Sequence, residues 1–190
     1  GSTLDAADST FNGVAALLLA SGGYINVNNS ESVGAITDVA ITAINGGTVV
    51  AVNADFRNSN SHGISCEHAS VYAENIKLSG ADGHAVRAIG GFVDVTGATA
   101  TGAGLNGITA VQGSRIIATS ANFVSSNGTN GISAQSGSHI TANSCNAQKG
   151  VSPGASDVSI SNGGIISFSG GTGGLSTTAN TVTGAGIIFQ

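Results

Sequence analysis

The chain has 190 residues, of which only 8% are charged, 30 are Gly and one is Pro, and its formal net charge is −5 at pH 7. Its five Lys and Arg residues are too few for a phosphate-binding surface, so a nucleic-acid partner is not expected. The longest apolar run, residues 14–20, is too short to span a bilayer, so no membrane insertion is expected either. Abundant Val, Ile and Thr instead favour ordered β structure.

The first 21 residues precede a regular repeat. We expect residues 1–21 to form an N-terminal cap or a first coil, after a Gly1-Ser2 start that is typical of a cloning addition. Solenoids need such caps because an open terminal coil leaves strand edges without partners.

A repeat then occupies residues 22–169. Copies begin at residues 22, 46, 68, 90, 113 and 137, with spacings of 24, 22, 22, 23 and 24, and a partial copy begins at 163. A second block precedes each copy, such as residues 63–66 (GISC) and 107–110 (GITA). Apolar and polar residues alternate with period two, which is typical of strands with one buried face. The pattern predicts an all-β fold: a single-stranded right-handed parallel β-helix of about seven coils of 22–26 residues, with three short strands per coil.

Equivalent positions of the copies predict continuous columns of like residues. Two apolar columns are expected to fill the core: Val49, Val71, Val93, Ile116 and Ile140, and Ala51, Ala73, Val95, Ala118 and Ala142. A turn column holds residue types that tolerate left-handed backbone: Asn29, Asn53, Asn75, Gly97, Ser120 and Ser144. Cys66 and Cys145 fall in different inward columns, so we expect free thiols rather than a disulfide.

The last segment, residues 170–190, ends in the apolar run 186–189. We expect this segment to be a C-terminal cap or a contact within a trimer, because such a run favours burial.

The repeat resembles the β-helical shafts of bacteriophage tailspikes and tail fibres. The resemblance covers residues 22–168 and rests on Asn-Gly-Ile corners at 106–108 and 130–132 and on Gly-Ser-x-Ile strands beginning at 113 and 137. It implies a homotrimer in the virion tail that recognises, and in some members cleaves, bacterial surface polysaccharide. Pectate lyases and autotransporter passengers share this coil, so the motifs specify the fold better than the family.

Several large apolar residues fall on outward positions. An exposed apolar stripe normally marks an interface, whereas scattered surface apolar residues are common. We therefore predict a subunit interface formed by Val50, Tyr72, Ile89, Phe92, Val111 and Ile117.

Charged residues gather in the middle coils. Glu67, His84 and Arg87 are candidates for carbohydrate binding, and Glu67 and Arg87 are expected in one outward column on adjacent coils. The same two residues fit a solvated surface ion pair better than a functional one. The weak catalytic candidates are Glu67, Glu74 and Asp94, of which Glu74 and Asp94 lie on adjacent coils but fit two separate exposed acids.

The four histidines are not expected to share a column closely enough to form a metal site, so no metal and no cofactor is expected. The leading interpretation is a structural, receptor-facing shaft, for which a non-enzymatic role is favoured but an enzymatic one stays open. A polysaccharide depolymerase (a glycoside hydrolase or lyase with its active site on the central coils) and an autotransporter-type adhesin remain the alternatives. Oligomeric state distinguishes the monomeric adhesin from the other two, and release of new reducing ends from polysaccharide distinguishes the depolymerase from the shaft.

Overall fold

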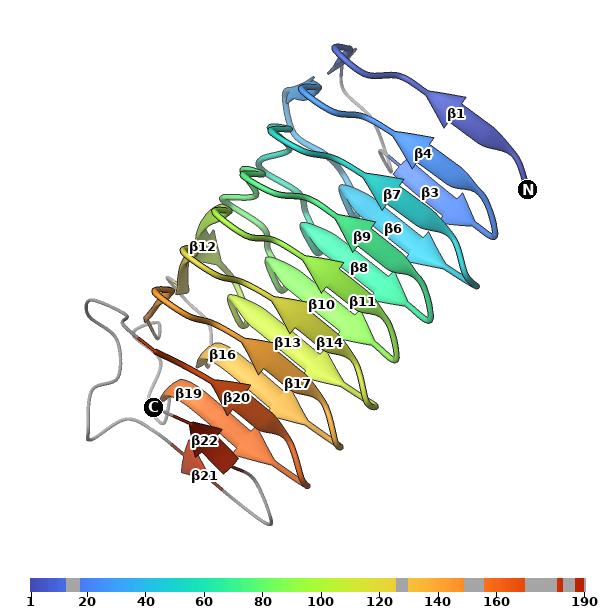
Figure 1. Cartoon of the computed structure of the whole chain (residues 1–190). Helices are drawn as coiled ribbons and strands as arrows, with labels where there is room; N and C mark the ends of the chain where they lie inside the picture. The colour runs from blue at the N-terminus through green and yellow to red at the C-terminus, as the bar shows by residue number, and fades with distance from the viewer. Residues whose placement is uncertain (13–17, 126–129, 149–155, 170–180, 183–186, 190) are drawn as a thin grey trace.

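The chain forms a parallel β-solenoid, in which it circles one long axis and returns to the same sheet one rung further along (Figure 1). The computed structural model describes residues 1–12, 18–125, 130–148, 156–169, 181–182 and 187–189. Strand pairs in all of its sheets are parallel, and none of the described residues is helical. The predicted all-β solenoid is therefore confirmed. None of the described segments is a helix that could cross a membrane.

The longest sheet has nine strands, one from each passage of the chain along this side. In spatial order they are β1 (Thr3–Asp5), β4 (Tyr24–Asn26), β7 (Thr48–Val50), β9 (Ser70–Tyr72), β11 (Phe92–Asp94), β14 (Arg115–Ile117), β17 (His139–Thr141), β20 (Ile165–Ser167) and β22 (Ile187–Phe189). The seven predicted copies contribute β4 to β20. The sheet continues beyond them, since β1 pairs with β4 and β22 pairs with β20.

An eight-stranded sheet forms a second side of the solenoid. It contains β3 (Leu18–Ser21), β6 (Ile41–Ile44), β8 (Ile64–Glu67), β10 (Val86–Ile89), β13 (Ile108–Val111), β16 (Asn130–Gln135), β19 (Ser156–Ser161) and β21 (Thr181–Val182). The six strands from β6 to β19 are the blocks that precede the copies in the sequence, and β3 and β21 extend the sheet at its two ends. Residues 13–17 and much of 170–190 lie outside the described residues, so the roles predicted for the two terminal segments stay predictions.

The third side is less regular than the other two. It has a three-stranded sheet of β12 (Thr99–Ala103), β15 (Asn122–Ser125) and β18 (Asn146–Gln148), and a pair of β2 (Thr10–Asn12) and β5 (Glu31–Val33). Between these two groups the ladder consists of single bridges at Asp55 and Lys77. A full third strand is therefore present in some coils only.

The core lies inside the coils and is built from stacked like residues. Val49 lies opposite Val71, Val71 opposite Val93, and the column continues through Ile116 to Ile140. All five residues are fully buried, as are the five residues of the predicted alanine-rich column. Large and small side chains thus alternate around a narrow lumen, which allows close packing. Phe56 and Phe123 are the largest fully buried side chains.

The predicted left-handed turn column is also confirmed. Asn29, Asn53 and Asn75 have φ of 56°, 58° and 57°. Their side-chain amides form a ladder: the Nδ2 of Asn53 donates to Oδ1 of Asn29 at 3.3 Å, and that of Asn75 donates to Oδ1 of Asn53 at 3.2 Å. The ladder stops at Gly97, where an added Cβ would collide with the Asn75 side chain.

Candidate functional site

The outer face of the eight-stranded sheet carries a polar column across the middle coils. Ser65, Arg87, Thr109 and Ser133 stand in register on successive strands. Ser65, Thr109 and Ser133 are nevertheless buried, with 6%, 7% and 0% exposure. Neighbouring polar side chains cover them: Nδ2 of Asn106 donates to Oγ1 of Thr109 at 2.8 Å, and Nε2 of Gln135 donates to Oγ of Ser133 at 3.1 Å. This face is therefore an ordered polar surface at Thr109 and Ser133, because neighbouring amides hold their hydroxyls.

Glu67 and Arg87 form an ion pair on this face, with Nη1 of Arg87 3.0 Å from Oε1 of Glu67. The prediction that they share one column was wrong, because Arg87 stands in register with Ser65 and Glu67 with Ile89. The two side chains reach each other diagonally instead. The Arg87 side chain is 32% exposed and that of Glu67 is 42% exposed, so water and ligands have access to both charges.

His62 and His84 lie one coil apart with their rings stacked, at a centroid distance of 5.1 Å and an interplanar angle of 23°. The histidines were considered in the sequence only as metal ligands, so this ring stack was not predicted. The signal was present in the sequence: His62-Gly63 and His84-Ala85 occupy the position of the Asn-Gly corners at 106–107 and 130–131. Because histidine and asparagine are different residue types, comparison of the copies does not readily show that they occupy the same position.

The surroundings of both histidines favour the neutral ring. Burial, the neighbouring His62 ring and the Arg87 guanidinium lower the pKa of His84 to about 4. Burial and Arg87 also lower the pKa of His62, against the opposing effects of Asp38 and Glu67. The Arg87 guanidinium thus lowers the pKa of both rings and also pairs with the Glu67 carboxylate. It therefore couples the two histidines electrostatically to the ion pair.

The three candidate acids do not gather at one place. Glu67 ends β8 of the eight-stranded sheet, whereas Asp94 ends β11 of the nine-stranded sheet and Glu74 lies in the turn that follows β9. Oδ1 of Asp94 accepts hydrogen bonds from the backbone N–H and the hydroxyl of Thr96, at 3.0 and 2.8 Å. The Asp94 carboxylate therefore closes its own turn.

The six residues predicted for a subunit interface divide between the two large sheets. Val50, Tyr72, Phe92 and Ile117 stand on the nine-stranded sheet, and Ile89 and Val111 end adjacent strands of the eight-stranded sheet. The rings of Tyr72 and Phe92 are 5.5 Å apart between centroids and tilted by 51°. Asp94 separates Tyr72 from Ile117 in their column, so the apolar stripe is interrupted.

A second charged group lies on the third side. Asp55 pairs with Nε of Arg57 at 2.5 Å and with Nζ of Lys77 at 3.4 Å. Arg57 and Lys77 have side chains 55% and 60% exposed, so this group is a solvated network of low energetic weight.

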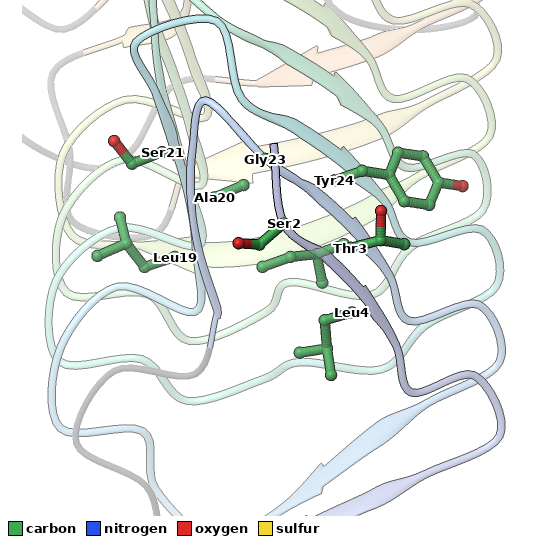
Figure 2. Close-up of a pocket in the computed structure, with 9 residues that line it drawn as sticks. Ser2, Thr3, Leu4, Leu19, Ala20, Ser21, Gly23 and Tyr24 are labelled. Atoms are coloured by element: carbon green, nitrogen blue, oxygen red, sulfur yellow. The ribbon is translucent and has the colours of Figure 1, made fainter.

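The N-terminal end of the solenoid is hollowed. A cavity of about 220 Å³ opens between β1 and β3, lined by residues that include Leu4, Leu19 and Tyr24 (Figure 2). Leu4 stands in the same column as the buried Ile25, yet it is 50% exposed because no further rung covers it within the described residues. The cavity is thus the open end of the core.

The described residues include no group of three or more His, Cys, Asp or Glu that could hold a metal ion. Cys66 and Cys145 are buried free thiols, as predicted. Burial raises the pKa of Cys66 to about 11 and that of Cys145 to about 12. Neither thiol has the exposure or the low pKa that nucleophilic cysteines need.

Comparison of the chain with protein-family models, with curated proteins and with solved structures gives no match.

Proposed function

We propose that this chain is a shaft segment of a phage tailspike or tail fibre, that it acts in the virion tail as a homotrimer, and that it recognises bacterial surface polysaccharide. The observation that carries the recognition step is the Glu67–Arg87 ion pair on the outer face of the eight-stranded sheet, together with His84, which lies in the connection before β10 and is influenced by the Arg87 charge. These are the three residues that the sequence nominated for carbohydrate binding.

The chemistry of this group suits a sugar. Vicinal hydroxyls pair well with a carboxylate, which accepts two hydrogen bonds, and with a guanidinium, which donates two in a fixed plane. Both charges of the Glu67–Arg87 pair stay accessible to ligand. They stand on strands rather than loops, so their positions are fixed before the ligand arrives. Little side-chain entropy would therefore be lost when a ligand binds to such a site.

The apolar outward residues support the trimeric part of the proposal. Tyr72 is 41% exposed, and its ring contacts that of Phe92 on the next rung. Ile89 and Phe92 flank one turn at the corner where the two large sheets meet. Parallel copies packed about a threefold axis would bring this corner of each chain together, and symmetry would repeat the contact three times.

Glycan binding tests the recognition step. We expect the chain to bind a member of a panel of capsule and O-antigen polysaccharides, measured by calorimetry, and Arg87→Ala to weaken binding by at least tenfold. Arg57→Ala is the matched control, because Arg57 also pairs with a carboxylate but stands on the third side. Equal binding by wild type and Arg87→Ala, or no binding across the panel, would refute the proposed site. Release of new reducing ends would favour the depolymerase alternative.

Light scattering tests the trimer. We expect a mass three times the 18.3 kDa of one chain. Tyr72→Glu should dissociate the assembly, while Val33→Glu, at a residue 52% exposed on the third side, should leave it intact. A monomeric wild-type chain would rule out the shaft and favour the adhesin alternative.

A further inference from the structure

Four residues in one column, here called the histidine ladder, join successive coils: His62, His84, Asn106 and Asn130. Nδ1 of His62 accepts the backbone N–H of His84 at 3.0 Å, and Nδ1 of His84 accepts the backbone N–H of Asn106 at 3.1 Å. One rung further, Oδ1 of Asn106 accepts the backbone N–H of Asn130 at 3.0 Å. The imidazole nitrogen and the amide oxygen therefore have the same role on neighbouring coils: each accepts a backbone N–H from the next coil.

This arrangement fixes the protonation state of both rings. A ring nitrogen accepts a hydrogen bond only when it carries no proton, so each Nδ1 is bare and the proton of the neutral ring resides on Nε2. An amide oxygen does not titrate at physiological pH. The two histidine rungs are therefore sensitive to acid and the rung formed by Asn106 is not.

Packing leaves little room for the rings to move away. An added Cβ at Gly83 would collide with the His62 ring, so the connection that leads to β10 passes directly against that ring. The rings themselves stack at 5.1 Å, where two positive charges would repel each other.

The charged groups that act on the rings are Arg87 on β10, Glu67 on β8 and Asp38 before β6. Arg87 opposes protonation of both rings, whereas Asp38 and Glu67 favour a charged His62. Burial opposes both charges and is the largest effect at each ring.

We propose that His62 and His84 form an acid-sensitive latch, which holds the connections leading to β10 and β13 at neutral pH and opens when the rings become protonated. Protonation turns each Nδ1 from an acceptor into a donor that faces a backbone N–H. At His84 the Thr109 hydroxyl, 3.3 Å from Nδ1, can accept from the protonated ring, but the backbone N–H cannot. The backbone N–H groups of His84 and Asn106 then lose their acceptors, which weakens the middle coils. The hydrogen bond from the Asn130 N–H to Oδ1 of Asn106 does not depend on pH and is kept.

Replacement of both histidines by Asn is the direct test, because Asn106 shows that an amide oxygen fits this column. The readout is the unfolding equilibrium of the full chain as a function of pH. The pKa of His84 falls from its ordinary value of 6.5 to about 4 in the folded chain. This difference alone corresponds to a loss of about 300-fold in the wild-type folding constant as the pH falls from 6.5 to about 4. The variant His62→Asn/His84→Asn should lack this part of the pH dependence, and the control His139→Asn should retain it.

An equal pH dependence in wild type and double variant would overturn the proposal. If the double variant does not fold, magnetic resonance of the wild-type imidazoles decides instead. The signals of His62 and His84, assigned with the single Asn variants, should show protonated Nε2 with bare Nδ1 at pH 7 and should titrate below 6.5. Protonated Nδ1 at pH 7, or midpoints at or above 6.5, would refute the latch. Neither readout involves a glycan, so this result is independent of the proposed function.

Discussion

The N-terminal rung and the middle coils place the same kinds of residue in the same columns, yet they bury them very differently. Leu4, Ile25 and Val49 are consecutive members of one inward column, and their exposures are 50%, 7% and 0%. Burial is thus complete only where a residue has a rung on each side. In a solenoid, the interaction between neighbouring coils therefore supplies the core, and an end rung receives about half of it.

Truncation of a middle rung should have the largest effect. Ile116 is fully buried between Val93 and Ile140, so Ile116→Ala removes three carbons from a site that cannot collapse along the axis. We expect a loss of about 3–4 kcal/mol in the free energy of unfolding, measured by denaturant titration. A loss below about 1 kcal/mol would mean that the middle coils are no better packed than the end.

Acid should weaken the middle coils by a similar amount. The pKa of His84 is lowered in the folded chain from 6.5 to about 4, so its contribution is fully present above pH 6.5 and is lost as the pH falls towards 4. The loss should be about 3 kcal/mol, since each pH unit corresponds to about 1.4 kcal/mol. Thermal unfolding between pH 7 and 4 measures it. Amide exchange at a fixed pH, compared between β10 and β1, would show whether the middle coils respond more than the end.

Loss of an asparagine rung should have an intermediate effect. Asn75→Ala removes the amide that donates to Asn53 and forces alanine into a φ of 57°. A cost of about 1–2 kcal/mol is expected from the backbone conformation and the hydrogen bond together. Asn75→Gly separates the two contributions, because it keeps the conformational freedom and loses only the amide. Alanine and glycine variants of equal stability would show that the backbone conformation is not the larger cost.

The end rung should tolerate truncation best. Leu4→Ala removes a side chain that is already half exposed, so the free energy of unfolding should fall by less than about 1 kcal/mol. Ile25→Ala, one rung further in, should fall between Leu4→Ala and Ile116→Ala. A large effect at Leu4 would show that another chain or segment covers the N-terminal rung in solution.

Much of this architecture could be predicted from the sequence, because strand periodicity and repeat length act together. Val71 and Val93 had to be neighbours once each copy was aligned, and the parity of the strands then placed Glu67 and Arg87 outside. The sequence could not give the diagonal reach of Arg87 to Glu67, since that depends on side-chain length and rotamer. It also did not reveal the ring stack of His62 and His84, because their function as acceptors equates them with asparagine, a residue type of different shape. The third side was predicted as fully stranded, but at Asp55 and Lys77 the ladder is reduced to single bridges.

The central claim is that equivalent residues stand directly above one another along one axis. Spin-label distances test it, with one label at Tyr24 and the other at Arg115, His139 or Ile165, which are four, five and six rungs away in the nine-stranded sheet. Cys66 and Cys145 would first be replaced by Ala, which their columns already contain. With about 4.8 Å per rung, backbone separations of about 19, 24 and 29 Å are expected, so the label distances should increase in equal steps. Distances that do not increase from Arg115 to Ile165, as in facing antiparallel sheets, would contradict the solenoid and every column that depends on it.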